Sequence, residues 1–333
     1  MATHARRPLG RSDLYVNPVG LGCMGMSEFY GPAMDEDAAV ELIHEALERG
    51  VNHFDTAEMY GIGHNESVVG RALRDRRDGV VIATKFGPLR DTETGEFIGV
   101  DGSRENVRRA SDGSLERLGT TIDLYYLHRL DPETAIETTA EAVAELVEEG
   151  KVTAFGLSEA GPETIRRAHS VMPVTAVQTE YSLFSRSVED GVLPVCRELG
   201  ITLVAYSPLG RGLLTGRFDE DSPPEGEGEF RQGPSQPRFA EGNYERNLAL
   251  VETVKTVAGA HGVSPAQVAL AWVLARGREV VSIPGTTKLE NLVSNLGALD
   301  VVLTREDRET LDRLGEQVAG ERYNEYGMQA VEE

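Results

Sequence analysis

Short runs of apolar and β-branched residues recur along the chain, each bounded by glycine, polar or turn-forming residues, as is typical of buried strands. The run that ends at residue 128 is representative, since four consecutive apolar and aromatic residues precede a histidine. Eight such runs are predicted to be strands, at 18–23, 52–55, 80–86, 123–128, 152–158, 174–181, 202–207 and 280–284.

Helical segments lie between these runs. Residues 35–50 and 133–150 carry apolar side chains at helical spacing and end at Gly50 and Gly150, and glycine commonly ends a helix. Residues 264–277 begin with a serine and a proline, the residue types favoured at the start of a helix. The predicted buried faces consist of Val40, Ile43 and Leu47 in the first segment and Ile136, Val143 and Val147 in the second.

The alternation of strand and helix predicts parallel strands covered by helices, because parallel strands need crossover connections. Eight repeats indicate a closed (β/α)8 TIM barrel, with a doubly wound open sheet as the alternative. No glycine-rich G-x-G-x-x-G motif follows the first strand, which disfavours the open sheet. We therefore expect residues 1–333 to form a single barrel domain.

Three segments fall outside the repeat. Residues 7–22 are expected to form an N-terminal hairpin that closes the barrel floor. Residues 219–243 are rich in proline, glycine and glutamate and too long for a simple connector, so they are either a lid-like loop or disordered. A C-terminal tail follows the last repeat.

Composition restricts the classes of function. Of the 333 residues 40% are hydrophobic, and the net charge of −22 disfavours binding to nucleic acid or to anionic membranes. The chain has no long apolar run and no secretory signal, so we expect a cytoplasmic protein. Cys23 and Cys196 are then expected to be free thiols rather than a disulfide.

Four polar residues follow or end predicted strands, where the active sites of barrels lie. They are Asp55, Tyr60, Lys85 and His128. Each residue alone could cap a loop, extend to solvent or pack. Together they suit the donation of a proton to a carbonyl oxygen that is being reduced. A lysine anchored by an aspartate is expected to lower the pKa of the phenol, and the histidine would orient a substrate oxygen. Reduction also needs a hydride, which no side chain supplies, so a nicotinamide cofactor is implied.

The chain resembles the aldo-keto reductase family over nearly its whole length. The resemblance rests on the motifs FDTAEMYGIGHNE, TKFG, YYLHRLDP, QTEYSLFSR and AYSPLGRGLLTG. It is strongest to the branch of perakine reductase and pyridoxal-reductase-like enzymes. This resemblance implies NADPH-dependent reduction of an aldehyde or ketone, with Tyr60 as the general acid and Asp55, Lys85 and His128 as its partners.

The resemblance also implies the residues that hold NADPH. Tyr206 would stack on the nicotinamide, and Ser158 and Gln178 would bind its carboxamide, while Glu159 stands where many members carry asparagine. Residues matching the pyrophosphate loop are Ser207, Leu209, Gly210 and Gly212, with Arg211 as a further cation. Residues matching the adenosine and 2′-phosphate region are Gly285, Thr286, Thr287, Lys288, Asn291 and Asn295; Asn291 stands where many members carry arginine.

Other readings remain open at this stage. The protein could be a redox-sensing regulatory subunit with little turnover, similar to potassium-channel β-subunits, although no docking extension is recognised. A lyase that forms a Schiff base on Lys85 is disfavoured by the pairing with Asp55. The seven histidines show no metal-ligand spacing. We expect a small-molecule carbonyl substrate, which the sequence does not name, and a monomer or weak homo-oligomer.

Overall fold

The computed structural model describes residues 4–332, and its centre is an eight-stranded parallel sheet. Neighbouring strands follow the order β12-β11-β10-β9-β8-β5-β4-β3, and the sheet curls round until β3 meets β12. Parallel bridges from Val19 to Ser282 and from Gly22 to Gly285 close the ring. The predicted (β/α)8 barrel is confirmed, and the open sheet is wrong. The strands are β3 (Leu21–Gly22), β4 (His53–Asp55), β5 (Val81–Phe86), β8 (Ile122–Leu127), β9 (Val152–Ser158), β10 (Val174–Glu180), β11 (Thr202–Tyr206) and β12 (Val280–Ser282).

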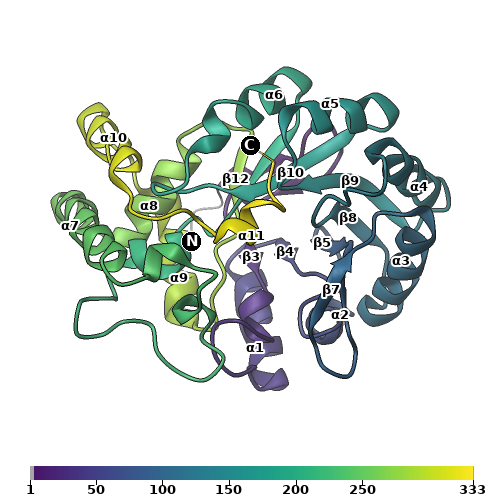
Figure 1. Ribbon diagram of the computed structural model, residues 1–333, viewed down its shortest axis with the longest axis horizontal. Helices are drawn as coiled ribbons and strands as arrows, with labels where there is room; N and C mark the ends of the chain where they lie inside the picture. Colours follow the sequence, from purple (N-terminus) through teal and green to yellow (C-terminus); the bar gives the residue numbers. More distant parts are fainter. Residues whose placement is uncertain (1–3, 333) are drawn as a thin grey trace.

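Helices surround the sheet (Figure 1). Helices α1, α3, α8, α10 and α11 start with a side-chain cap; in α8, for example, the hydroxyl of Ser264 accepts a hydrogen bond from the backbone N–H of Gln267. The helices are α1 (Glu36–Glu48), α2 (His64–Leu73), α3 (Arg104–Leu118), α4 (Ile136–Glu148), α5 (Pro162–Val171), α6 (Val192–Leu199), α7 (Asn243–His261), α8 (Pro265–Leu274), α9 (Leu289–Gly297), α10 (Arg305–Asp312) and α11 (Glu325–Met328).

The core has two parts. One fills the space between strands and helices, where Ile43 of α1 and Val143 of α4 are fully buried as predicted. The other fills the barrel interior with alternate strand residues such as Val81, Leu124 and Val204. The interior is therefore packed, so chemistry is confined to the ends of the barrel.

The N-terminal hairpin closes one end of the barrel, as predicted. Strands β1 (Arg7–Pro8) and β2 (Tyr15–Val16) pair antiparallel, and Leu9 and Val16 belong to the interior core. The turn at Gly10 lies so close to the sheet that a Cβ there would stand 2.5 Å from the carbonyl oxygen of Thr175.

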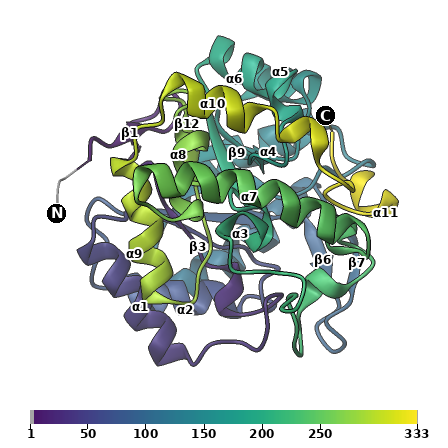
Figure 2. The ribbon, with the colours of Figure 1, turned by 90° about the vertical axis from the view of Figure 1, so that its left-hand side faces the viewer.

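The opposite end is covered by three segments. Figure 2 shows β1 at one end of the molecule and α11 at the other, beside the hairpin of β6 (Pro88–Arg90) and β7 (Phe97–Val100). Residues 219–243, for which the sequence allowed either a lid or disorder, contain two 3-10 turns, Phe230–Gln232 and Pro237–Phe239, and bury Arg231.

Candidate active site

Three of the predicted catalytic side chains are in direct contact at the end of the barrel opposite the N-terminal hairpin of β1 and β2. The ammonium group of Lys85, which is fully buried, donates hydrogen bonds to a carboxylate oxygen of Asp55 and to the backbone carbonyl of Thr56, 2.7 Å away. It also lies 3.4 Å from the hydroxyl oxygen of Tyr60. The other Asp55 oxygen accepts a hydrogen bond of 2.7 Å from the amide of Gln178.

The strands explain this convergence. Asp55 ends β4 and Lys85 lies one residue before the end of β5, which pairs with β4 in parallel register. His128 directly follows β8, the next strand in the sheet. Its ring packs edge-on against the Tyr60 ring, with centroids 5.7 Å apart. The carboxyl ends of adjacent parallel strands therefore gather four side chains that are up to 73 positions apart in sequence.

The Tyr60 loop is held by Asn65, a fully buried residue of α2 that sequence analysis did not single out. Its side-chain amide donates hydrogen bonds of 2.8 Å to the carbonyl of Cys23 and to the hydroxyl of Ser27, and its oxygen accepts one of 2.6 Å from Thr56. These contacts tie the start of α2 to Thr56 and to the segment of Cys23 and Ser27, and so hold both ends of the loop that carries Tyr60.

Electrostatics at the site differ from the expectation in one respect. Burial raises the pKa of Tyr60 well above its ordinary value, and Asp55 raises it further. The predicted lowering by lysine is therefore wrong as a net direction, because desolvation of the phenolate outweighs the nearby cation. Burial, with Lys85 and Arg129, lowers the pKa of His128 well below normal, so its imidazole is neutral. The site holds a protonated phenol and a neutral histidine.

The predicted carboxamide-binding residues lie beside this group. Ser158, at the end of β9, accepts a hydrogen bond of 3.2 Å from the guanidinium of Arg129, and Gln178 of β10 is bound to Asp55. Glu159 points to a different partner, the guanidinium of Arg322 in the C-terminal tail, through bonds of 3.0 and 2.9 Å. Its carboxylate is therefore engaged in a buried ion pair with the tail.

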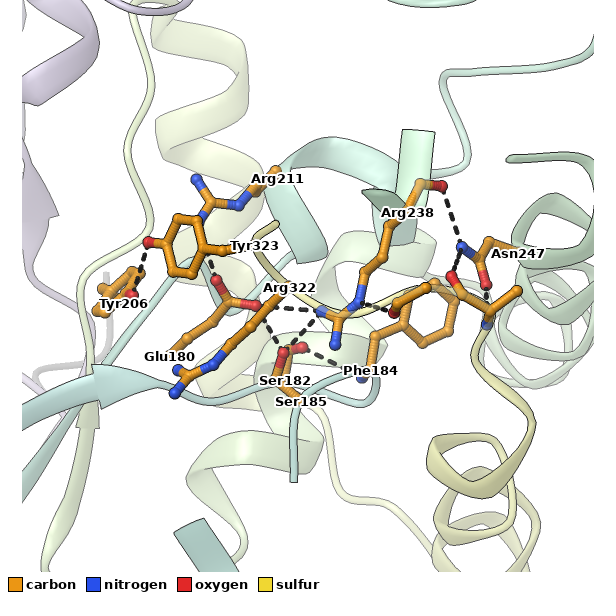
Figure 3. Close-up of polar contacts among 12 residues, drawn as sticks. Glu180, Ser182, Phe184, Ser185, Tyr206, Arg211, Arg238, Asn247, Arg322 and Tyr323 are labelled. Atoms are coloured by element: carbon orange, nitrogen blue, oxygen red, sulfur yellow. Dashed lines mark hydrogen bonds and ion pairs between the residues drawn. The ribbon is translucent and has the colours of Figure 1, made fainter. Parts of the chain in front are cut away.

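The loop after β11 carries the predicted stacking and pyrophosphate residues. Tyr206 shares a hydrogen bond of 3.0 Å with the hydroxyl of Tyr323 in the tail, and the Arg211 guanidinium lies 4.8 Å from the Tyr323 ring centroid (Figure 3). The backbone has positive φ at Ser207, Arg211 and the two glycines between and after them, a conformation found in anion-binding loops. Leu209 lies within this loop, and a Cβ at Gly212 would meet the Phe218 ring at 3.0 Å.

The residues of the predicted 2′-phosphate region lie together around the start of α9. Lys288 is the residue before the first turn of the helix, and its backbone N–H donates a 3.1 Å hydrogen bond to the hydroxyl of Thr286. Gly285, Thr287, Lys288 and Asn291 are exposed, whereas Asn295 is buried. Open donors around a helix N-terminus suit a phosphate group.

Besides Asn65, four residues at this end were missed as site residues. Arg322 and Tyr323 lie in the tail, which has no periodic pattern and whose position depends on the finished barrel. Arg90 of β6 binds the carboxylate of Glu28 at 2.7 Å and the carbonyl of Met59 at 3.0 Å, joining two loops beside Tyr60. Arg129 could have been found, since it adjoins His128 in the same strand-end motif.

Within residues 4–332, no single helix combines the length and apolar character needed to cross a membrane; only α7 and α8, bent by 91° relative to each other, satisfy both criteria jointly.

Comparisons with known proteins agree with this geometry. Residues 18–316 match the sequence pattern described as the aldo/keto reductase family. A probable aldo-keto reductase 1 from Glycine max is 43% identical over 321 residues, which cover 95% of this chain and 91% of the relative. Among solved structures, a glycerol dehydrogenase from Gluconobacter oxydans superposes with a TM-score of 0.85 at 31% identity, covering 96% of this chain and 98% of the other. An aldo/keto reductase from Klebsiella pneumoniae, solved with NADP and acetate, superposes with a TM-score of 0.73 at 30% identity, covering 96% of this chain and 98% of the other.

Proposed function

The chain belongs to the aldo/keto reductase family, and from that premise we propose that it reduces an aldehyde or ketone to the alcohol with NADPH. The observation that carries the proposal is the contact of a buried, protonated Tyr60 with the ammonium group of Lys85, 3.4 Å from its hydroxyl, while His128 packs against its ring. This is a proton donor beside a place for a carbonyl oxygen.

The residues present fit a nicotinamide dinucleotide. The Tyr206 ring offers a flat surface for the nicotinamide, the left-handed loop from Ser207 to Gly212 offers backbone amides to phosphate oxygens, and the exposed Lys288 offers an ammonium group to a further phosphate. When bound, the reduced nicotinamide supplies the hydride.

The side chains of this site handle the proton. Tyr60 keeps its proton at neutral pH because burial raises its pKa, so it can donate to the substrate oxygen as that oxygen gains negative charge. Lys85 stabilises the phenolate that remains, and Asp55 with the Thr56 carbonyl holds the lysine in place.

His128 fixes the substrate oxygen. Its Nδ1 is buried without a hydrogen-bond partner among the described residues, so Nε2 is the ring nitrogen left to face a substrate. Because burial and the two nearby cations keep the imidazole neutral, Nε2–H can donate to the carbonyl oxygen without transferring its proton. Tyr60 is then the acid and His128 the orienting donor.

The test is a screen of aldehydes and ketones with NADPH, following the absorbance of the reduced cofactor, with Tyr60→Phe as the matched variant. The variant removes one hydroxyl group and should lose at least about 100-fold in turnover. The dissociation constant for NADPH should stay within about two-fold, because the hydroxyl acts on the substrate oxygen. Near-normal turnover by Tyr60→Phe would show that another group is the acid.

We further propose that the chain is a cytoplasmic monomer or weak homo-oligomer, that residues 1–333 form one domain, and that it belongs to the branch of perakine reductase and pyridoxal-reductase-like enzymes. The strand-end motifs support the branch assignment, and the charge of −22 supports a small-molecule partner.

A further inference from the structure

Arg129 is a cation at the active site that the proposed mechanism does not use. It follows His128 at the end of β8, and one guanidinium nitrogen, Nη1, donates hydrogen bonds to the His128 carbonyl, 2.7 Å away, and to the Ser158 hydroxyl, 3.2 Å away. The side chain is half-buried. In the part of the chain that the structure describes, Arg129 forms no ion pair, and Nε and Nη2 have no hydrogen-bond partner.

Four other arginines around this end of the barrel are paired with carboxylates. Arg90 binds Glu28 at 2.7 Å and Arg322 binds Glu159 at 2.9 Å. Arg211 and Arg238 share the carboxylate of Glu180, at 3.0 and 3.1 Å (Figure 3). Lys85 is paired with Asp55. Among these groups six cations, Arg129 included, face four carboxylates, so one positive charge is in excess around Glu180 and one lies on Arg129.

The two excess charges lie on different sides of the site. Arg211 belongs to the loop after β11, beside the predicted pyrophosphate residues. Arg129 follows β8, which β9 and β10 separate from β11 in the sheet, and which pairs directly with β5 and its Lys85. Arg129 also acts on Tyr60 and His128, since it lowers the pKa of both groups. The first charge suits the cofactor phosphates, and the second lies with the proton donor.

A half-buried guanidinium that forms no ion pair can bind an anion through local charged hydrogen bonds, against the repulsion expected from a protein of net charge −22. We propose that Arg129 is a specificity-determining residue that binds the carboxylate of an anionic carbonyl substrate, so that the preferred substrates are aldehydes or ketones bearing a carboxyl group. This inference rests on the proposed reductase function. Arg129 would hold the carboxylate while His128 and Tyr60 hold the carbonyl oxygen.

The experiment compares substrates that differ only in charge. The probes are the meta and para isomers of carboxybenzaldehyde and the methyl ester of each, reduced with saturating NADPH by the wild type, Arg129→Gln and Arg129→Lys. The wild type should prefer at least one acid over its ester. Arg129→Gln should lower kcat/KM for that acid about 10- to 100-fold more than kcat/KM for its ester, as expected for a charged hydrogen bond, and mostly through KM. The ester should change only to the extent that Arg129 acts on Tyr60 and His128. The kcat/KM of Arg129→Lys for the acid should lie between those of the wild type and Arg129→Gln, because lysine keeps the charge and lacks the planar guanidinium.

Two readouts separate this role from a structural one. Raising ionic strength should raise the ratio of the acid's KM in the wild type to its KM in Arg129→Gln, because salt weakens the contact with Arg129 in the wild type alone and screens the net charge of −22 in both proteins. The dissociation constant for NADPH should change by a smaller factor than kcat/KM for the acid, because Arg129 reaches the proposed cofactor residues only through the Ser158 hydroxyl. If kcat/KM falls by the same factor for acid and ester in Arg129→Gln, Arg129 supports the fold and the proposal is wrong. If NADPH binding weakens by as much as kcat/KM for the acid falls, Arg129 supports the cofactor and the proposal is equally wrong.

A binding measurement distinguishes this proposal from the reductase function itself. If the wild type reduces none of the probes, the proposed function loses its support, but the anion site is still measurable by calorimetric titration of the NADP+-containing protein with benzoate and with benzamide. Arg129→Gln should raise the dissociation constant for benzoate about 10-fold or more and leave that for benzamide unchanged. Equal benzoate affinity in wild type and variant would overturn the proposal.

Discussion

Arg322→Met tests the buried ion pair that fastens the C-terminal tail to the end of β9. The side chains of Arg322 and Glu159 are 4% and 0% exposed and share two hydrogen bonds. Removing one partner of a buried pair typically costs about 3–5 kcal/mol, because the other charge stays buried. Glu159 keeps two further donors, the Thr179 hydroxyl at 3.3 Å and the Glu180 N–H at 3.1 Å. We therefore expect a loss near the low end, about 3 kcal/mol.

A double-mutant cycle gives the sharpest form of this prediction. Glu159→Gln alone should also destabilise, since it removes the carboxylate that is hydrogen-bonded to the buried guanidinium. In the double variant neither charge is buried, so the free energy of unfolding should recover, and the coupling energy should be about 2 kcal/mol or more. The assay is urea denaturation with linear extrapolation. The exposed pair of Arg305 and Glu309 supplies the control: Arg305→Met should leave stability unchanged within error. Additive losses in the double variant would refute the assignment of a coupled pair.

Three further predictions concern protonation and cofactor choice. Lys85→Met should move the alkaline limb of the pH profile for reduction to higher pH, because the phenolate of Tyr60 loses the cation 3.4 Å away; an unmoved limb in steady-state kinetics would contradict the coupling. Lys288→Ala should weaken NADPH binding by about 1.5–3 kcal/mol and leave NADH nearly unchanged, as measured by fluorescence titration; a constant ratio of the two dissociation constants would make Lys288 a simple surface charge. Burial lowers the pKa of His53 from 6.5 to about 4, so the unfolded chain takes up the proton first and stability falls as pH drops from about 6.5 to about 4. His53→Leu should flatten that decline by about 3 kcal/mol in urea denaturation, and an identical slope would show that His53 does not titrate there.

The strand and helix rhythm could be predicted from sequence because burial imposes it locally. Strands β5 and β8 to β12 place apolar residues into both cores, so the runs around Leu124 and Val204 can be recognised from the local sequence alone. Side chains at strand ends, such as Asp55 and Lys85, were also predictable, because parallel pairing brings strand ends together whatever the loops do.

What sequence did not predict depends on contacts between distant segments. The position of Arg322 is set by Glu159, 163 residues earlier, and nothing local indicates that pair. The direction of the Tyr60 pKa shift also needed the structure: burial and Asp55 raise the pKa, Arg129 lowers it, and only the packed site determines which effect is larger.

The join between β3 and β12 makes the barrel mechanically uneven. Strands β8 and β9 pair over most of their length, whereas β3 has two residues and meets the last strand through isolated bridges. Because few backbone hydrogen bonds join these two strands, local opening of the barrel should occur most often between β3 and β12. Gly285, at the edge of the predicted adenosine region, belongs to one of those bridges. A dinucleotide bound beside Gly285 would therefore reduce local opening between β3 and β12, in addition to its part in the reaction.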